Sequence, residues 1–177
     1  MSNVVLYIAQ SLDGFIAKPD NNIDWLTSVP PSVKGDYSYT ELINSIDTII
    51  MGRKTYEVIL AMQEDWMYKG KTSYIVSSNQ HLKIEAPDTH PYNGDLKLLV
   101  DTIKQKSGKD IWLIGGGELI TGFINADLID KMIITVVPKI IGEGIPLFAP
   151  IPKESVWQLV NVESFETGLV NLTYEKL

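Results

Sequence analysis

The 177-residue sequence contains no cysteine. This absence excludes disulfides, thiolate metal sites and cysteine nucleophiles. Positive charge is also scarce, because 15 lysines and arginines stand against 22 aspartates and glutamates, for a net charge of −7. That balance argues against a surface for nucleic acid or for an anionic membrane. The only histidines, His81 and His90, are isolated from each other, so we expect surface residues and no metal site.

Long hydrophobic runs are missing as well. No apolar window approaches the ~20 residues that a membrane span requires, and no basic region followed by a long apolar run opens the chain. We therefore expect no membrane partner and a location in the cytoplasm. With 45% hydrophobic residues the chain is long enough to bury a large core, and residues 1–177 are expected to form one domain.

The most informative stretch is residues 111–123, I-W-L-I-G-G-G-E-L-I-T-G-F. A short apolar run stops at Gly115, Gly116 and Gly117, and a helical pattern starts at Glu118, which predicts a buried strand that turns sharply into a helix. Glycine lets the backbone approach a ligand closely, and the start of a helix attracts anions. A phosphate or pyrophosphate fits this turn. A tight turn without a ligand explains a lone glycine triplet equally well.

The remaining pattern alternates strands and helices. Strands are predicted at 4–9, 48–51, 73–76, 111–114 and 131–138, helices at 33–46, 53–60, 95–106 and 118–126, an irregular connection or edge hairpin at 79–94, and an antiparallel hairpin at 156–165 and 169–177. Asp95 is the expected N-cap of its helix. The fold class is therefore an α/β sheet that is mostly parallel and is closed by an antiparallel edge.

Several polar or glycine-rich segments follow these strands. They are the loop after Ala9, the run from Gly52 to Thr55 (G-R-K-T), the pair Ser77-Ser78 and the glycine triplet. In open α/β sheets ligands lie across the carboxyl ends of the strands, so these segments are expected to meet. Arg53 is suited to bind a phosphate through paired N–H donors, although Arg53 and Lys54 alone would describe a solvated helix start. Together the segments favour a ligand with several phosphates, such as a dinucleotide.

Four runs carry a family resemblance. In order they are I-A-Q-S-L-D-G-F-I-A, I-I-M-G-R-K-T-Y-E, Y-I-V-S-S and W-L-I-G-G-G-E-L. This order resembles the dihydrofolate reductase superfamily. The later run I-T-V-V-P-K-I-I-G-E-G-I-P-L-F is similar to the branch that contains the C-terminal reductase domain of the bifunctional riboflavin biosynthesis deaminase-reductase. The resemblance covers about residues 3–175 and implies an NADPH-dependent reductase with a single three-layer mixed sheet.

The resemblance also implies roles for individual residues. Arg53 and Ser78 would neighbour the 2′-phosphate of adenosine, backbone N–H groups from Gly116 to Glu118 would face the pyrophosphate, and the loop from Asp13 to Trp25 would act as a lid. Ala9 and Ile16 would border the nicotinamide. The full cofactor set implied is Ala9, Ile16, Gly52, Arg53, Lys54, Thr55, Ser77, Ser78, Gly115, Gly116, Gly117, Glu118 and Leu119.

The proton for such a reduction must come from an acid or an ordered water. Folate reductases place a carboxylate 16 residues before the glycine of the Gly-Arg junction, and this count leads to Asp36, with Glu41 as a second candidate. The chain lacks the usual Trp-x-x-Pro sequence before it, and Asp36 could equally cap its helix. Trp25 could contact the substrate or lie in the core, and Thr135 could support the substrate or simply pack.

Three functions remain open at this point. The first is reduction of a riboflavin-pathway intermediate of the 5-amino-6-(5-phosphoribosylamino)uracil type, or of a pterin, with Lys139 available for a substrate phosphate. The chain carries no deaminase half, so it would act as a stand-alone reductase. The second is dihydrofolate reductase proper, and the third is a non-catalytic NADPH-binding regulatory protein. The apolar C-terminal hairpin and the stretch 132–141 predict a homodimer.

Overall fold

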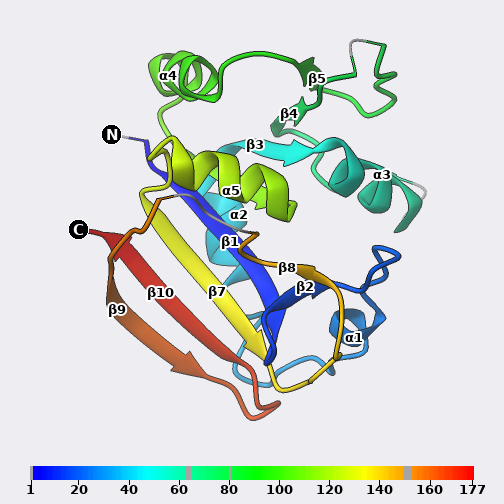
Figure 1. Cartoon of the computed structure of the whole chain (residues 1–177), viewed down its shortest axis with the longest axis vertical. Helices are drawn as coiled ribbons and strands as arrows, with labels where there is room; N and C mark the ends of the chain where they lie inside the picture. Colours follow the sequence, from blue (N-terminus) through cyan, green and yellow to red (C-terminus); the bar gives the residue numbers. More distant parts are fainter. Residues whose placement is uncertain (1, 63–64, 80, 150–152) are drawn as a thin grey trace.

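The computed structural model describes residues 2–62, 65–79, 81–149 and 153–177. Eight strands form one sheet in the order β5-β4-β3-β6-β1-β7-β10-β9, and β2 pairs with β8 beside it (Figure 1). The strands are β1 Val4–Ser11, β2 Phe15–Ala17, β3 Ile46–Gly52, β4 Thr72–Val76, β5 Thr89–Tyr92, β6 Asp110–Gly115, β7 Lys131–Val137, β8 Ile145–Pro146, β9 Trp157–Ser164 and β10 Val170–Lys176. The helices are α1 Asp24–Thr27, α2 Tyr39–Ser45, α3 Arg53–Met62, α4 Leu96–Lys106 and α5 Gly117–Asn125.

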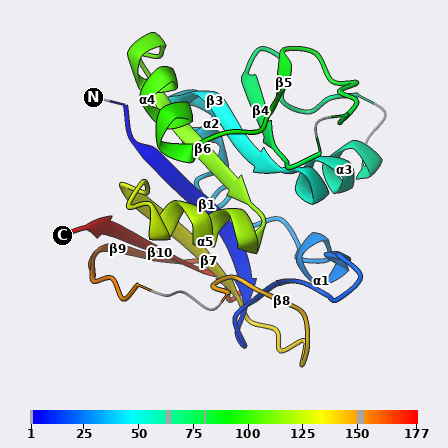
Figure 2. The same cartoon turned by 45° about the horizontal axis from the view of Figure 1, so that its top comes forward.

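The direction of the strands confirms the expected fold class. Neighbouring strands from β5 through β7 pair in parallel, whereas β10 runs antiparallel to both β7 and β9. The antiparallel pair is the C-terminal hairpin expected around Thr167-Gly168. Figure 2 shows helices on both faces of the twisted sheet, which makes the three layers of the fold.

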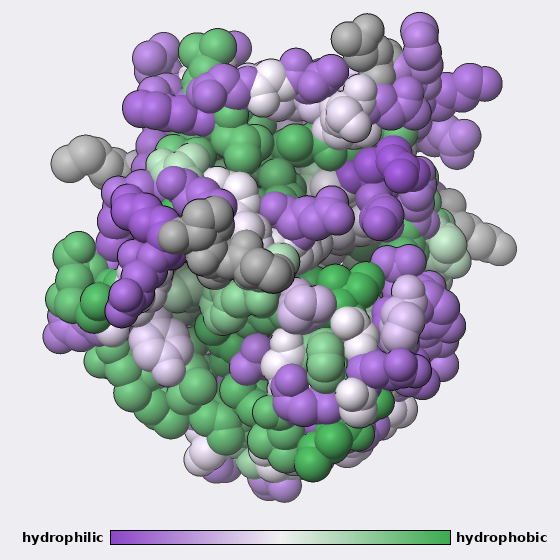
Figure 3. Space-filling view, in the orientation of Figure 1, coloured by the Kyte–Doolittle hydropathy of each residue, from purple (hydrophilic) through white to green (hydrophobic). Residues whose placement is uncertain are grey.

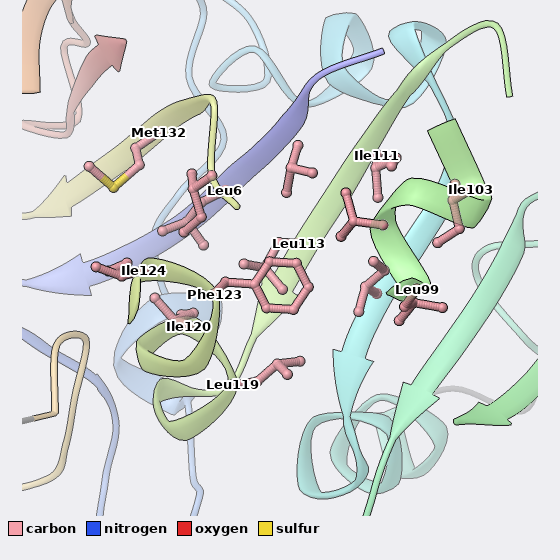
Figure 4. Close-up of a cluster of buried hydrophobic side chains, with 14 of the residues drawn as sticks. Leu6, Leu99, Ile103, Ile111, Leu113, Leu119, Ile120, Phe123, Ile124 and Met132 are labelled. Carbon is pink, nitrogen blue, oxygen red and sulfur yellow. The ribbon is translucent and has the colours of Figure 1, made fainter. Parts of the chain in front are cut away.

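Strand β1 lies inside the sheet because its side chains are apolar on both faces. Val4 and Leu6 belong to the cluster under α4 and α5, whereas Val5 belongs to the cluster under α2 and α3. Figure 4 shows the first cluster, in which Phe123 of α5 lies among side chains of the sheet. Such burial is the main favourable term in folding, so the central strands hold the carboxyl edge of the sheet in a fixed position.

The opposite face carries a chain of aromatic rings. Neighbouring ring centroids lie 5.2–6.5 Å apart, and the rings are those of Tyr56, Trp66, Tyr68, Trp112, Tyr7 and Tyr39. The indole N–H of Trp112 donates to the carbonyl of Tyr7 at 3.1 Å. Edge-to-face packing of this kind is favourable beyond its buried area, and it fixes α2 and α3 against the sheet.

One expectation about local structure is wrong, and of the two alternatives offered for another segment one is wrong. The helix expected at 33–46 begins only at Tyr39, because Tyr37 and Ser38 have φ values of 61° and 70°, outside the helical region. For 79–94 the edge hairpin is wrong, since β5 pairs with β4 in parallel, whereas the described residues between these two strands form the irregular connection that was the other alternative. The expected N-cap of α4 is confirmed: the side chain of Asp95 accepts a hydrogen bond of 2.8 Å from the N–H of Leu98.

Candidate functional site

The two glycine junctions meet at the carboxyl edge of the sheet. Met51 of β3 pairs with Gly115 of β6, so both strands end at the same level. A Cβ atom on Gly52 would lie 3.7 Å from the carbonyl oxygen of Gly115 and from the nitrogen of Gly116. A Cβ atom on Gly116 would lie 3.5 Å from Oγ1 of Thr55. The two glycine segments therefore form one surface, as the parallel strands led us to expect.

Backbone geometry at the triplet requires glycine. Gly115 has a φ of +128°, a conformation that residues with a Cβ atom rarely adopt. The peptide bond between Gly115 and Gly116 is cis. Gly116 is the N-cap of α5 and has no side-chain hydrogen bond to offer the helix. The first N–H groups of α5 have no side-chain cap, so they are available to donate hydrogen bonds to a phosphate oxygen.

The basic end of this surface lies beside β4. Gly52 pairs with Val76, so Arg53 and Ser77, the residues that follow, begin from neighbouring strands. Ser78 and Lys54 are exposed, and the hydroxyl of Ser77 accepts a hydrogen bond of 3.1 Å from the N–H of Asn79. The charged groups thus follow the strand next to the glycine turn, and the hydroxyl groups follow the strand beyond it, an arrangement that suits a ligand with several phosphates.

The other end of the edge is formed by β1 and the loop that follows it. Ala9 packs in a cluster with buried Trp25, together with Val137, Phe165 and Leu169. Ile16, on β2, packs instead against the cluster under α5. The structure thus brings Ala9 and Trp25 together and places Ile16 in a different cluster.

The loop from Asp13 onward is tied to the segment after β7. The carboxylate of Asp13 accepts hydrogen bonds from the hydroxyl of Ser11 at 2.6 Å and from the N–H groups of Ile141 and Gly142 at 3.2 and 2.8 Å. The hydroxyl of Ser11, followed by the two N–H groups, holds the pKa of this carboxyl below its ordinary value. Strand β2 then pairs with β8 across this loop.

Trp25 and Lys139 contact each other. The Nζ of Lys139 donates to the carbonyl of Trp25 at 2.9 Å and to the hydroxyl of Ser28 at 2.7 Å. The ammonium group of Lys139 is therefore bound to a carbonyl and a hydroxyl oxygen at the C-terminal end of α1. The indole N–H of Trp25 is buried and has no hydrogen-bond partner among the described residues.

Asp36 lies at the surface, before α2. Its carboxylate accepts a hydrogen bond of 2.8 Å from the N–H of Thr40 and a second one from the hydroxyl of the same residue. The hydroxyl of Thr40 is the main cause of a lowered pKa at Asp36. The N-cap position of α2 belongs to Ser38, so Asp36 is not the cap residue, but its carboxylate still binds an N–H group of the first helical turn. Its negative charge also acts on Tyr7 and Tyr39.

Three polar side chains on one face of the sheet form a network with the backbone carbonyl of Tyr37, in the turn before α2. Thr135 of β7 donates to Oδ1 of Asn171 of β10 at 2.7 Å, and Nδ2 of Asn171 donates to the carbonyl of Tyr37 at 2.8 Å. The hydroxyl of Tyr7 donates to the same carbonyl at 2.9 Å. Burial raises the pKa of Tyr7 to about 12. Its phenol is therefore a neutral donor near neutral pH.

Sequence reasoning missed three members of this network. Tyr7 was assigned only to a strand, although it lies two residues before Ala9 and must share its face. Asn171 stands as a polar residue within an apolar strand, which was an available signal of a buried partner. Tyr37 contributes only its backbone carbonyl, and nothing in a side-chain pattern indicates that.

No group of three or more histidine, aspartate or glutamate side chains among the described residues is arranged to hold a metal ion. Within the same described part of the chain, no helix combines the length and the apolar character needed to cross a membrane.

The strand order and the glycine edge together define a dihydrofolate reductase-like α/β protein. A model of the RibD C-terminal domain matches residues 66–171, more than half of the chain, and the chain therefore belongs to this family. The Bacillus subtilis (strain 168) protein YwjB is 37% identical over 167 residues, and the match covers 91% of each chain. A structure described as "Putative riboflavin biosynthesis protein" from Shewanella sp. PV-4 has a TM-score of 0.88 at 29% identity and covers 99% of both chains.

Two more distant structures share the fold. The deaminase and 5-amino-6-(5-phosphoribosylamino)uracil reductase from Thermotoga maritima has a TM-score of 0.74 at 16% identity, over 99% of this chain and 57% of that one. Dihydrofolate reductase from Enterococcus faecalis, complexed with NADP(H), has a TM-score of 0.68 at 19% identity, over 98% and 96% of the two chains. The family is reductase-like, and this supports an oxidoreductase.

Proposed function

We propose that this protein is an NADPH-dependent reductase that transfers a hydride to a small heterocyclic substrate. The observation that carries the proposal is the contact between the two glycine junctions, where a Cβ atom on Gly52 would meet Gly115 and Gly116. A bare backbone surface beside two helix starts and an arginine suits a pyrophosphate with a further phosphate nearby. The RibD C-terminal domain family supports the same conclusion.

Different residues of this edge would bind different parts of the cofactor. Gly115 to Leu119 would hold the pyrophosphate through backbone N–H groups, and Gly52 to Thr55 with Ser77 and Ser78 would hold the adenosine phosphates. Ala9 and Ile16 would border the nicotinamide. When bound, NADPH would supply the hydride. The loop from Asp13 to Trp25, tied down through Asp13, would keep water away from the reacting atoms.

A titration with NADPH, followed by nicotinamide fluorescence, tests the cofactor. Gly116→Ala is the most informative variant. Its Cβ atom would make only an ordinary van der Waals contact with Thr55, so the fold should be kept, and yet it would occupy the surface proposed for the pyrophosphate. We expect its affinity for NADPH to fall by about tenfold or more. Gly108→Ala, which points into open space, is the matched control. Absence of binding to the parent protein at high cofactor concentration would refute the proposal.

The substrate is proposed to be a riboflavin-pathway aminopyrimidine or a pterin, by analogy with the family. Loss of NADPH absorbance in the presence of an aminopyrimidine, a pterin or dihydrofolate would identify it. Asp36→Asn should lower the rate by about 100-fold if this carboxylate, or a water that it orders, supplies the proton. Because Asp36 also accepts a hydrogen bond from the first turn of α2, the unfolding of the variant must be measured alongside. Binding of NADPH without turnover of any compound would favour the regulatory protein instead.

We also propose a homodimer that forms through the C-terminal hairpin. In Figure 3 hydrophobic atoms gather at the lower left, where Figure 1 draws β9 and β10. Leu159 and Val162 of β9 are 48% and 53% exposed, and Leu172 and Tyr174 of β10 pair opposite them. These strands border a hollow of about 370 Å³ that Trp157 and Phe148 also line. An exposed apolar surface of this kind is typical of a protein contact.

A further inference from the structure

Arg53, the arginine proposed to meet the 2′-phosphate, already has an anionic partner. Its Nη1 lies 2.6 Å from Oε1 of Glu57, and the two side chains are 39% and 50% exposed. Residues four apart on a helix are neighbours on one face. Arg53 is the first residue of α3, so the ion pair directs its guanidinium along the helix toward Glu57 and away from the helix start. The phosphate surface lies at that start.

The position of the Arg53–Glu57 ion pair bears on the choice between NADPH and NADH. NADPH differs from NADH only by the 2′-phosphate, a group with nearly two negative charges. Arg53 stands at the end of β3 beside Ser77, where Gly52 pairs with Val76, and this is the basic end of the glycine surface. Glu57 neutralises the charge of Arg53 there and places its own negative charge within a few ångströms of any anion bound by the same guanidinium.

We propose that Glu57 sets the preference of this protein between NADPH and NADH by competing with the 2′-phosphate for Arg53. The inference rests on the proposed function. Its consequence is a site that accepts both dinucleotides with a smaller preference for NADPH than Arg53 alone would give. Exposed charges interact weakly, so the effect is a shift in selectivity and not a switch. Because the pair is exposed, the effect also weakens as salt concentration rises.

The test measures dissociation constants of NADPH and NADH, by nicotinamide fluorescence, for the parent protein and for Glu57→Gln. Glutamine keeps the size and the helix propensity of glutamate and removes only its charge. We expect the affinity for NADPH to increase by about three- to tenfold at low salt, and the affinity for NADH to change by less than about twofold.

Asp101→Asn is the matched control. It removes the acidic partner from another ion pair with the same spacing, Lys97 Nζ to Asp101 Oδ2 at 2.8 Å, on α4 at the opposite face of the sheet. This control should change neither affinity. In an Arg53→Ala background the effect of Glu57→Gln on NADPH should largely disappear, because the group under competition is gone.

Other outcomes would overturn the inference. If Glu57→Gln leaves NADPH affinity unchanged while both dinucleotides bind, Glu57 has no role in selectivity and the reductase proposal stands. If the variant weakens NADPH more than NADH, Glu57 positions Arg53 for the phosphate and the sign of the inference is wrong. If the parent protein binds neither dinucleotide, this inference and the proposed function fail together. Thermal unfolding of each variant shows that the fold is kept.

Discussion

The buried hydroxyl of Thr135 donates a hydrogen bond of 2.7 Å to Oδ1 of Asn171. This contact determines the orientation of the amide, so that its N–H₂ group faces the carbonyl of Tyr37 at 2.8 Å. Asn171 thereby joins β7 and β10 to the turn before α2. The turn contains Tyr37 and Ser38 in the left-handed region, which ordinary residues adopt at a cost, so the surrounding contacts must hold it.

The first prediction concerns this network. Thr135→Val keeps the size of the side chain but leaves Oδ1 of Asn171 buried without a donor, so the free energy of unfolding should fall by about 1–3 kcal/mol. Asn171→Leu should have a similar cost. The double variant should lose less than the sum of the two, because the residues share one network.

Urea denaturation measures these differences. Thr173→Val is the control, since Thr173 is buried on β10 and its hydroxyl makes no hydrogen bond to another described residue. Full additivity of the Thr135 and Asn171 variants would contradict the network.

A second prediction concerns the stability at alkaline pH. Burial raises the pKa of Tyr7 to about 12, so the folded protein holds this proton more tightly than the unfolded chain does. The resulting stability is complete below about pH 10, the ordinary pKa of tyrosine, and is lost as the pH rises toward about 12. The loss amounts to about 2–3 kcal/mol.

Tyr7→Phe should therefore show a flatter decline of unfolding free energy across this pH range. The comparison is made by urea denaturation at several pH values on both proteins. Tyr68 and Tyr39 also have raised pKa values from burial, so part of the decline should remain in the variant. Identical slopes for the two proteins would argue against a buried Tyr7 phenol.

A third prediction concerns the close approach of β8 to β2. A Cβ atom on Gly144, the residue before β8, would clash with the carbonyl oxygen of Ala17, which is backbone and cannot rotate away. Gly144→Ala must displace one of the two strands, and we expect a Tm lower by about 2–12 °C. Gly108→Ala meets nothing within 4 Å and should leave the Tm nearly unchanged. Calorimetry distinguishes the two; equal values would show that the β2–β8 contact is loose.

A fourth prediction tests the proposed homodimer. Val162→Lys places a charge on the exposed apolar side of β9, and light scattering should then give the mass of one chain instead of two. Val33→Lys is the control, because Val33 is 91% exposed and lies outside this surface. A parent protein that already has the mass of one chain would remove the dimer from consideration.

The sequence was a good guide wherever the pattern was local. The apolar run of β1, the helix capped by Asp95 and the glycine turn before α5 are dictated by neighbouring residues, and the structure agrees with each. The meeting of Gly52 with Gly116 could be expected as well, because parallel strands end at one edge.

The segment before α2 was harder to predict, because long-range contacts decide its conformation. The turn at Tyr37-Ser38 depends on Tyr7 and Asn171, which are 30 and 134 residues distant in the chain. The apolar spacing at 39–46 predicts a helix that starts as early as residue 33, because no neighbouring residue signals the turn. For the same reason the spacing that led to Asp36 could not reveal its hydrogen bonds to Thr40.

The tip of the C-terminal hairpin reaches back to the segment before α2. The carboxylate of Glu166 accepts hydrogen bonds from the hydroxyl of Ser32 and the N–H of Val33, and Glu163 accepts one from the hydroxyl of Ser38. The glycine edge of the sheet is made by the central strands, whereas these contacts are made by the last two strands of the chain. Sequence changes at residues 163–167 would therefore reshape the segment before α2 while leaving the glycine edge of the sheet unchanged.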